Sequence, residues 1–135
     1  MPVLNQPLND GYYVAKASVL KASETIPYGN VAMMVGGKIR AALTAVANST
    51  LLGMSMQNLA ETTGADVTLS QPAVFIRGQV VYLNGKAGDL PTAVLLGSPV
   101  ALDTSSSVKA TIAANDLTLI LVDVRADGMF GVRIP

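Results

Sequence analysis

The sequence contains no histidine, no cysteine and no tryptophan, and only 13% of its 135 residues carry charge. The first two absences exclude a histidine general base, a cysteine nucleophile, a disulfide bond and the usual ligands of a zinc site. Half of the residues are nevertheless hydrophobic. The composition therefore favours a protein that packs against a partner over one that transforms a substrate, and we expect neither catalytic residues nor a cofactor.

Charge is balanced as well as scarce. Nine basic and nine acidic residues give a formal net charge of zero, whereas soluble domains carry about 25% charged residues. Low net charge promotes association, so we expect part of the apolar surface to be covered in a homo-oligomer or a larger assembly. The chain also lacks a basic stripe and a platform of aromatic rings, which predicts that it does not bind nucleic acid.

The length corresponds to about one domain. The opening segment MPVLNQPLNDGYY has no basic region followed by a continuous apolar run, so it does not resemble a secretory signal. The sequence contains no run of about 18 apolar residues. We therefore expect neither a signal peptide nor a membrane-spanning segment.

Residues 1–11 are predicted to form an extended arm, because Pro2 and Pro7 disfavour helix and Asn9-Asp10-Gly11 is a turn signal. Residues 12–135 are then one β-rich domain. Two similar halves, at about 29–70 and 78–135, are an alternative, because GNVAMMVGGK near the start of the first half resembles GQVVYLNGK at the start of the second.

The strand signals are distributed along the whole domain. Residues 31–35 and 38–43 predict a hairpin around Gly36-Gly37, and Gly53 inside an apolar stretch predicts a bulge or a close backbone contact. Residues 73–83 form the strongest β segment and precede a hairpin signal at Asn84-Gly85. No long segment shows the helical period of 3.6. The predicted fold is all-β, a small sandwich or barrel of roughly seven to ten short strands with an extended N-terminal arm.

Several patterns could indicate ligand chemistry, and each has a simpler interpretation. Gly37-Lys38 and Gly85-Lys86 lack the rest of a phosphate-binding loop and are predicted to be hairpin turns. Asp116, Asp123 and Asp127 could hold a calcium ion, but their spacing matches no EF-hand loop. We expect Asp116 and Asp127 to be turn residues. Asp123 is expected either to face solvent or to form an ion pair with Arg77 or Arg125. We therefore expect no metal site.

Two further patterns concern substrates. Ser105, Ser106 and Ser107 lie close in sequence to Lys109 and could form a serine–lysine dyad, but a serine run between strands is ordinarily a loop. A ligand-binding or carbohydrate-binding β-module would need its aromatic rings to converge. The tyrosines available for that purpose are Tyr12, Tyr13, Tyr28 and Tyr82.

Three segments resemble the small capsid decoration, or cement, proteins of tailed bacteriophages. They are GNVAMMVGGKIRAAL, LLGMSM and ADVTLSQPAVFIRG, which begin at residues 29, 51 and 65. The shared pattern is a G-x-V strand, a glycine turn, an apolar L-G strand, a T-T-G-A-D type turn and a strand ending near V-F-x-x-G. The resemblance covers residues 29–83 and, more loosely, the chain through residue 102.

This resemblance implies a structural protein of the virion that binds the outer surface of a capsid and stabilises contacts between capsomers. Its implied partners are the major capsid protein and copies of itself, most commonly in a homotrimer. An N-terminal arm could lie on the capsid or add a strand to a neighbouring sheet. Another virion role, in a tail, a connector or a head-fibre base, is the alternative. The expected contact residues are Pro2, Val3, Leu4, Pro7, Leu8, Tyr12 and Tyr13.

Overall fold

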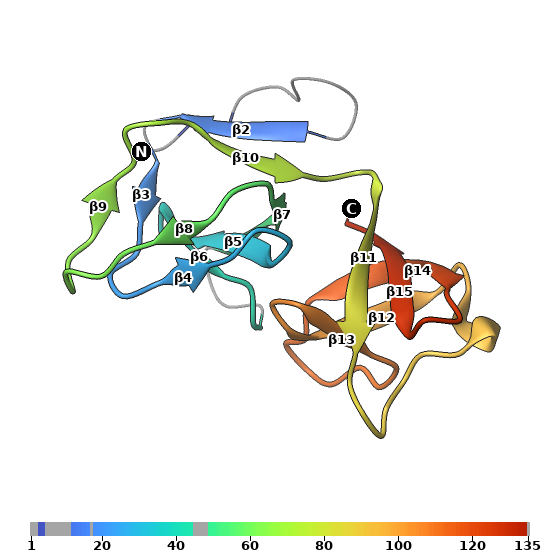
Figure 1. Cartoon of the computed structure of the whole chain (residues 1–135). Helices are drawn as coiled ribbons and strands as arrows, with labels where there is room; N and C mark the ends of the chain where they lie inside the picture. The colour runs from blue at the N-terminus through green and yellow to red at the C-terminus, as the bar shows by residue number, and fades with distance from the viewer. Residues whose placement is uncertain (1–2, 5–11, 17, 45–48, 135) are drawn as a thin grey trace. The chain divides into compact units, whose positions relative to one another are not determined.

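The computed structural model describes residues 3–4, 12–16, 18–44 and 49–134, with the backbone alone for the first two ranges. Among these residues there are fifteen strands and one short 3-10 turn, which confirms the all-β class (Figure 1). In chain order the elements are β1 (Val3–Leu4), β2 (Tyr12–Lys16), β3 (Val19–Leu20), β4 (Thr25–Ile26), β5 (Val31–Val35), β6 (Lys38–Ala41), β7 (Ser49–Ser55), β8 (Leu59–Ala60), β9 (Val67–Thr68), β10 (Ala73–Ile76), β11 (Val80–Gly85), η1 (Ala93–Leu95), β12 (Pro99–Thr104), β13 (Ser107–Lys109), β14 (Thr118–Val124) and β15 (Met129–Arg133).

The chain divides into two compact units. Unit 1 contains residues 1–42 and 46–77, and unit 2 contains residues 43–45 and 78–135. The strand count exceeds the predicted seven to ten because five strands (β1, β3, β4, β8 and β9) have only two residues each. A two-residue strand is too short to show an alternating pattern, so sequence periodicity cannot predict it.

The hairpin predicted for residues 31–35 and 38–43 is confirmed, with its second strand ending at Ala41. Val35 faces Lys38 across the turn, and the two residues between them have positive φ angles, 56° at Gly36 and 81° at Gly37. A two-residue primed turn requires this conformation, which glycine adopts without steric cost. Lys38 therefore begins a strand, as the hairpin interpretation of Gly37-Lys38 predicted.

The bulge predicted at Gly53 is also confirmed. The register between β5 and β7 shifts there, because Ala32 faces Gly53 whereas Met33 faces Leu51, which leaves Leu52 as an extra residue. Gly53 has a φ of 139°, and a Cβ atom at this position would collide with the carbonyl oxygen of Ile76. Backbone conformation and close packing therefore both require glycine.

Unit 1 is built on an eight-stranded sheet in the order β1-β2-β10-β7-β5-β6-β3-β9. Residues 12–20 run antiparallel to residues 67–76, with β2 paired to β10 and β3 paired to β9. We call these two segments the ribbon. In the strand order β2 and β3 are second and seventh, although only residues 17 and 18 separate them in sequence. Because the link spans at most about 11 Å, the sheet must curl until its two ends approach each other.

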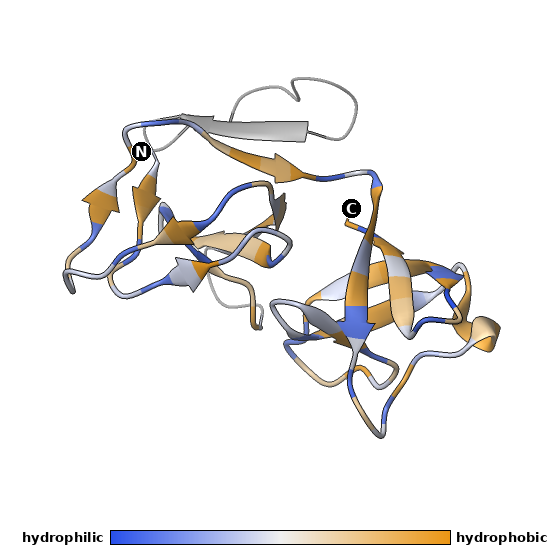
Figure 2. Ribbon diagram, in the orientation of Figure 1, coloured by the Kyte–Doolittle hydropathy of each residue, from blue (hydrophilic) through white to orange (hydrophobic). Residues whose placement is uncertain are grey.

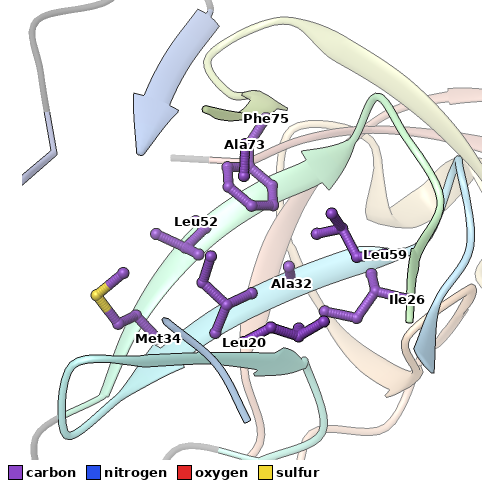
Figure 3. Packing of buried hydrophobic residues seen from close by; sticks show 9 residues of the cluster. Leu20, Ile26, Ala32, Met34, Leu52, Leu59, Ala73 and Phe75 are labelled. Carbon is purple, nitrogen blue, oxygen red and sulfur yellow. The ribbon is translucent and has the colours of Figure 1, made fainter. Parts of the chain in front are cut away.

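The core of unit 1 lies inside this curled sheet (Figure 3). Its buried members come from seven strands and are Leu20, Ile26, Ala32, Met34, Ile39, Leu52, Leu59, Ala73 and Phe75. Strand β5 is buried on both faces: Met34 belongs to this cluster, and Met33, which points to the opposite side, is 1% exposed. Both adjacent methionines are therefore buried by the chain itself.

Unit 2 contains a closed barrel in the order β11-β13-β12-β14-β15, which β15 closes by pairing with β11. Alternate residues of each strand fill its interior. They are Val81, Leu83, Val100, Leu102, Val108, Leu119, Leu121, Phe130 and Val132. The sequence also predicts a C-terminal hairpin, with strands at residues 117–125 and 129–134 around Ala126-Asp127-Gly128, and it is present as β14 and β15. In this unit, apolar residues at every second position of a strand therefore correctly indicate the face that is buried inside the barrel.

Two predictions around residues 73–85 are wrong. The segment 73–83 is not one strand: β10 belongs to unit 1, β11 belongs to unit 2, and Gly78 lies between them with a φ of 80°. Asn84-Gly85 is not a hairpin turn, and it forms the end of β11, paired in parallel with Ser107 and Val108 of β13. Gly85 is needed for a different reason, because a Cβ atom there would collide with the Phe130 ring and the Leu90 side chain.

Candidate functional site

Four of the seven expected contact residues lie on an edge of the unit 1 sheet. Val3 and Leu4 form β1, which among the described strands pairs with β2 alone, and Tyr12 and Tyr13 begin β2. The other three, Pro2, Pro7 and Leu8, lie outside the described residues. Sheet edges present unpaired backbone groups and are common sites of strand addition. The edge position of β1 therefore agrees with the contact role expected for the N-terminus, without testing it.

Unit 2 exposes an apolar segment that sequence reasoning missed. Residues 90–96 contain no charged side chain, and Leu90, Val94 and Leu96 are 51%, 89% and 47% exposed. The middle of the segment is η1, which buries none of its residues (Figure 2, pale orange turn beside β14). The ends of the segment are fixed by the backbone: Ala110 donates to Asp89, and Gly97 donates to Leu121 at 2.7 Å.

We call residues 90–96 the apolar loop. The sequence predicts a loop at residues 86–93 and a strand from Val94 to Leu102 that Gly97 and Pro99 interrupt. Gly97 and Pro99 were already recognised as breaks in that strand, and the further signal that could have extended the loop is Pro91, just before the turn. Single exposed apolar residues are normal on a protein surface, but several within one short segment suggest a contact site.

A second exposed group lies on the outer face of the barrel. The Tyr82 hydroxyl donates to Asp123 at 2.8 Å, and the Arg125 guanidinium lies 5.0 Å from the centroid of the Tyr82 ring. The hydrogen bond to Asp123 raises the pKa of Tyr82 above its usual value. Gly131 lies directly beneath, where a Cβ atom would approach the Tyr82 ring to 3.0 Å. The ring thus covers a glycine, which gives Tyr82 a structural role in the barrel.

The most strongly constrained carboxylate of unit 1 is that of Glu61, which is 5% exposed. It accepts hydrogen bonds from the backbone N–H groups of Ser23 at 2.8 Å, Thr63 at 2.6 Å and Gly64 at 3.0 Å, and from the Thr63 hydroxyl. The hydroxyl contributes most, and together these donors lower the pKa of Glu61 to about 2. The donors come from two separate loops, so this carboxylate joins the loops and leaves little capacity for a ligand.

The same turn at residues 21–24 is held by two further acids. Asp66 accepts from the Ala22 N–H at 2.9 Å and forms an ion pair with Lys38, and that ion pair contributes most to lowering its pKa. Glu24 accepts from the Ala41 N–H at 2.8 Å. Sequence reasoning did not single out Glu61 or Asp66. No local pattern identifies them, because two of their backbone donors, at residues 22 and 23, are distant in sequence.

The three aspartates considered for calcium have separate protein partners. Asp116 accepts from the Ala113 N–H at 2.8 Å and pairs with Lys109 at 3.2 Å, and both contacts lower its pKa. Asp127 pairs with Arg125 at 2.6 Å. Asp123 bonds to Tyr82 in place of the arginine partners that we considered. Among the described residues, no group of three or more acids gathers at a possible metal position.

The serine-rich loop makes contacts that are typical of a turn. The Ser107 hydroxyl is 2.6 Å from the Thr104 hydroxyl and 3.3 Å from the Asp103 carboxylate. Lys109, the only base considered for a dyad, forms its ion pair with Asp116. Of the tyrosines that a sugar-binding site would need, Tyr28 belongs to unit 1 and Tyr82 to unit 2.

No protein-family model, no curated protein and no solved structure matches this chain. Within the described ranges, no helix has the length and apolar character needed to cross a membrane. The features of the chain that bear on function are the three sequence segments described above, the edge strand β1 and the apolar loop.

Proposed function

We propose that this protein is a structural component of a bacteriophage particle that binds the outside of the capsid and stabilises contacts between capsomers. Its partners in this role are the major capsid protein and further copies of itself, with a homotrimer as the favoured assembly. The three segments that resemble decoration proteins support the proposal, and so does a composition with little charge and no histidine or cysteine. No described cluster of side chains supports an enzymatic alternative more strongly.

The apolar loop is the observation that carries the proposal. Val94 exposes 89% of its surface in a segment without charge, between backbone hydrogen bonds that fix both ends. A fixed apolar protrusion of this kind loses little conformational entropy on binding and gains from burial. Edge strand β1 offers a second contact, by strand addition.

Co-sedimentation with purified capsids tests this function. We expect the native protein to sediment with expanded shells and Val94→Asp to reduce the bound amount at least about tenfold, because a charge at the centre of the contact would be buried without a partner. Ser70→Asp places the same charge at an exposed polar position of unit 1 and serves as the matched control. Equal binding by both variants would contradict a contact through the apolar loop.

Deletion of residues 1–11 tests the N-terminal contact in the same assay. The deletion removes β1, which pairs only with β2, so the circular dichroism spectrum should keep its β signature while shell binding weakens. Copy number distinguishes decoration from the other virion roles. Hundreds of copies on the head support decoration, whereas a few copies at one vertex or along the tail support a connector or tail component.

A further inference from the structure

The two units share one strand topology, although one connection differs greatly in length. In unit 1, β5 pairs antiparallel with β6 and β7, β6 pairs parallel with β3, and β10 pairs antiparallel with β7 and β2. In unit 2, β12 pairs in the same way with β13 and β14, β13 with β11, and β15 with β14 and β11. Residues 56–72 join β7 to β10, whereas residues 125–128 join β14 to β15. A surface that residues 56–72 cover in unit 1 therefore lacks an equivalent cover in unit 2.

The turn that follows β3 in unit 1 has a counterpart after β11 in unit 2. It reads Lys-Ala-Ser-Glu at residues 21–24 and Lys-Ala-Gly-Asp at residues 86–89. The N–H of the first residue donates to β6 at 3.0 Å in unit 1 and to β13 at 2.8 Å in unit 2, and the fourth N–H donates back to the first carbonyl, at 3.2 Å and 3.1 Å. The third residue has a positive φ in both turns, 62° and 85°. The two turns therefore have equivalent backbones.

In unit 1 this turn binds two carboxylates. The Ala22 N–H donates to Asp66 at 2.9 Å, and the Ser23 N–H donates to Glu61 at 2.8 Å. Both acids belong to the segment 56–72 that joins β7 to β10. Glu24, the acid of the turn itself, does not prevent this binding although it is adjacent in sequence. The second and third N–H groups of such a turn are therefore competent donors to carboxylates.

In unit 2 the same two N–H groups have no protein acceptor. Ala87 and Gly88 are exposed, and no described residue accepts a hydrogen bond from either N–H. Asp89, the acid of this turn, is engaged elsewhere, because its carboxylate accepts from the Thr111 N–H at 3.2 Å and from the Thr111 hydroxyl at 3.0 Å. The turn therefore keeps two donors for an acceptor from outside the chain.

We infer that the turn at residues 86–89 binds a carboxylate on an acidic segment of a partner protein. Ala87 and Gly88 supply the two N–H donors, as their counterparts do in unit 1. Lys86 adds a positive charge beside them: its side chain is 48% exposed, and its ammonium lies 3.8 Å from the Asp103 carboxylate. Hydrogen bonds from backbone N–H groups to a charged acceptor are stronger than neutral ones.

The chain itself indicates what the partner segment contains. In unit 1, Leu59 pairs with Ile26 on the strand that follows the turn, and Glu61, two residues later, reaches the turn. In unit 2, Leu90 follows the turn and is 51% exposed. We therefore expect a segment in which an apolar residue closely precedes an acid, so that the apolar side chain covers Leu90 while the carboxylate binds the turn.

Amide chemical shifts test the site directly. A synthetic peptide with the sequence of residues 57–68 is titrated into the ¹⁵N-labelled full-length protein. We expect saturable downfield shifts of the Ala87 and Gly88 amide protons. The peptide with Glu61→Gln and Asp66→Asn should bind at least about tenfold more weakly, because it loses the charge-assisted hydrogen bonds. Absent shifts, or equal affinity of the two peptides, would overturn the inference.

Removal of one donor provides a second readout. Ala87→Pro deletes an N–H at the second position of the turn, where proline is favoured, and should weaken binding of the acidic peptide several-fold with the β signature intact. Ala22→Pro makes the same change in unit 1 and is the matched control, with native affinity expected. Native affinity in Ala87→Pro would refute the turn as the site. The shifts of the native protein decide the question if a variant fails to fold.

Sodium acetate distinguishes a partner's segment from a free small carboxylate. Acetate lacks the apolar residue that covers Leu90, so saturation of the Ala87 and Gly88 shifts should need at least about a tenfold higher concentration than with the peptide. Saturation at the same concentration would refute the partner segment and leave a site for small carboxylates. The inference is independent of the capsid role, because its probe is a peptide. Peptide binding by a protein that ignores capsids refutes the capsid role alone.

Discussion

Carboxylates in unit 1 accept hydrogen bonds from the backbone of loops that are distant in sequence, and Glu61 is the clearest example. Its four donors come from Ser23, Thr63 and Gly64, so one buried side chain joins the turn at residues 21–24 to the loop after β8. Such a site needs the charged form of the carboxylate, because protonation makes one oxygen a donor and removes the acceptor capacity that two donors at each oxygen require. The stability of the folded protein is therefore expected to depend on pH through the ionisation of Glu61.

Glu61→Gln should lower the melting temperature of the protein at pH 7 by several degrees. The pKa of Glu61 falls from an ordinary 4.5 to about 2 on folding, so the stabilisation is fully present above pH 4.5 and is lost as the pH falls toward 2. Thermal unfolding of both proteins between pH 7 and pH 2 checks this prediction, and the two curves should converge at the acid end.

Thr63→Val provides the matched test of the cause. It removes the hydroxyl that contributes most to the lowered pKa of Glu61, so stability should begin to decline at a higher pH than in the native protein. A difference between native protein and Glu61→Gln that stays constant from pH 7 to pH 2 would refute the role assigned to the ionised form.

At the scale of single elements, the sequence predicts local features well and pairings over long distances poorly. The hairpin at residues 31–41 and the bulge at Gly53 were correct, because glycine and a period of two report on the adjacent backbone. The ribbon was not predicted, because no local pattern specifies that residues 12–20 pair with residues 67–76. Asn84-Gly85 was wrongly predicted to be a hairpin turn for a related reason. Glycine is required at position 85 because the Phe130 ring, which is distant in sequence, lies too close for a Cβ atom.

The same limit applies to the candidate site. Asp116 and Asp127 were recognised as turn residues from their neighbours in sequence, and both contact the backbone of their own turn. The apolar loop was missed, because valine and leucine are typical both of buried strands and of contact surfaces. Only the fold shows that Val94 is exposed.

The bulge in β7 makes Gly53 the most sensitive glycine of unit 1. Gly53→Ala should lower the free energy of unfolding by about 2–3 kcal/mol, because the new methyl group meets the Ile76 carbonyl at a φ of 139°. Gly36→Ala, at a positive φ but with open space around it, should cost only about 1 kcal/mol. Urea denaturation measures both, and equal losses would show that backbone conformation alone sets the cost.

At the scale of the whole molecule, each unit has its own hydrophobic interior. All nine residues of the cluster that contains Phe75 belong to unit 1, whereas the barrel strands of unit 2 bury a separate set that includes Leu121. Separate cores allow separate local unfolding. The two units should therefore respond differently to a defect in only one of them.

Phe75→Ala should destabilise unit 1 by about 3–5 kcal/mol and accelerate hydrogen exchange in β4–β8 and β10, while β11–β15 keep their protection. Leu121→Ala should instead accelerate hydrogen exchange in the barrel strands of unit 2, while the strands of unit 1 keep their protection. Hydrogen exchange followed by mass spectrometry checks both variants. Uniform acceleration along the whole chain in either variant would indicate a single cooperative unit.

The ribbon also dictates an order of events during protein synthesis. Strand β2 leaves the ribosome about sixty residues before its partner β10. At about 5–20 residues per second, β2 waits roughly 3–12 s before its own chain can pair with it. During that interval the described partner available to β2 within its own chain is the two-residue strand β1.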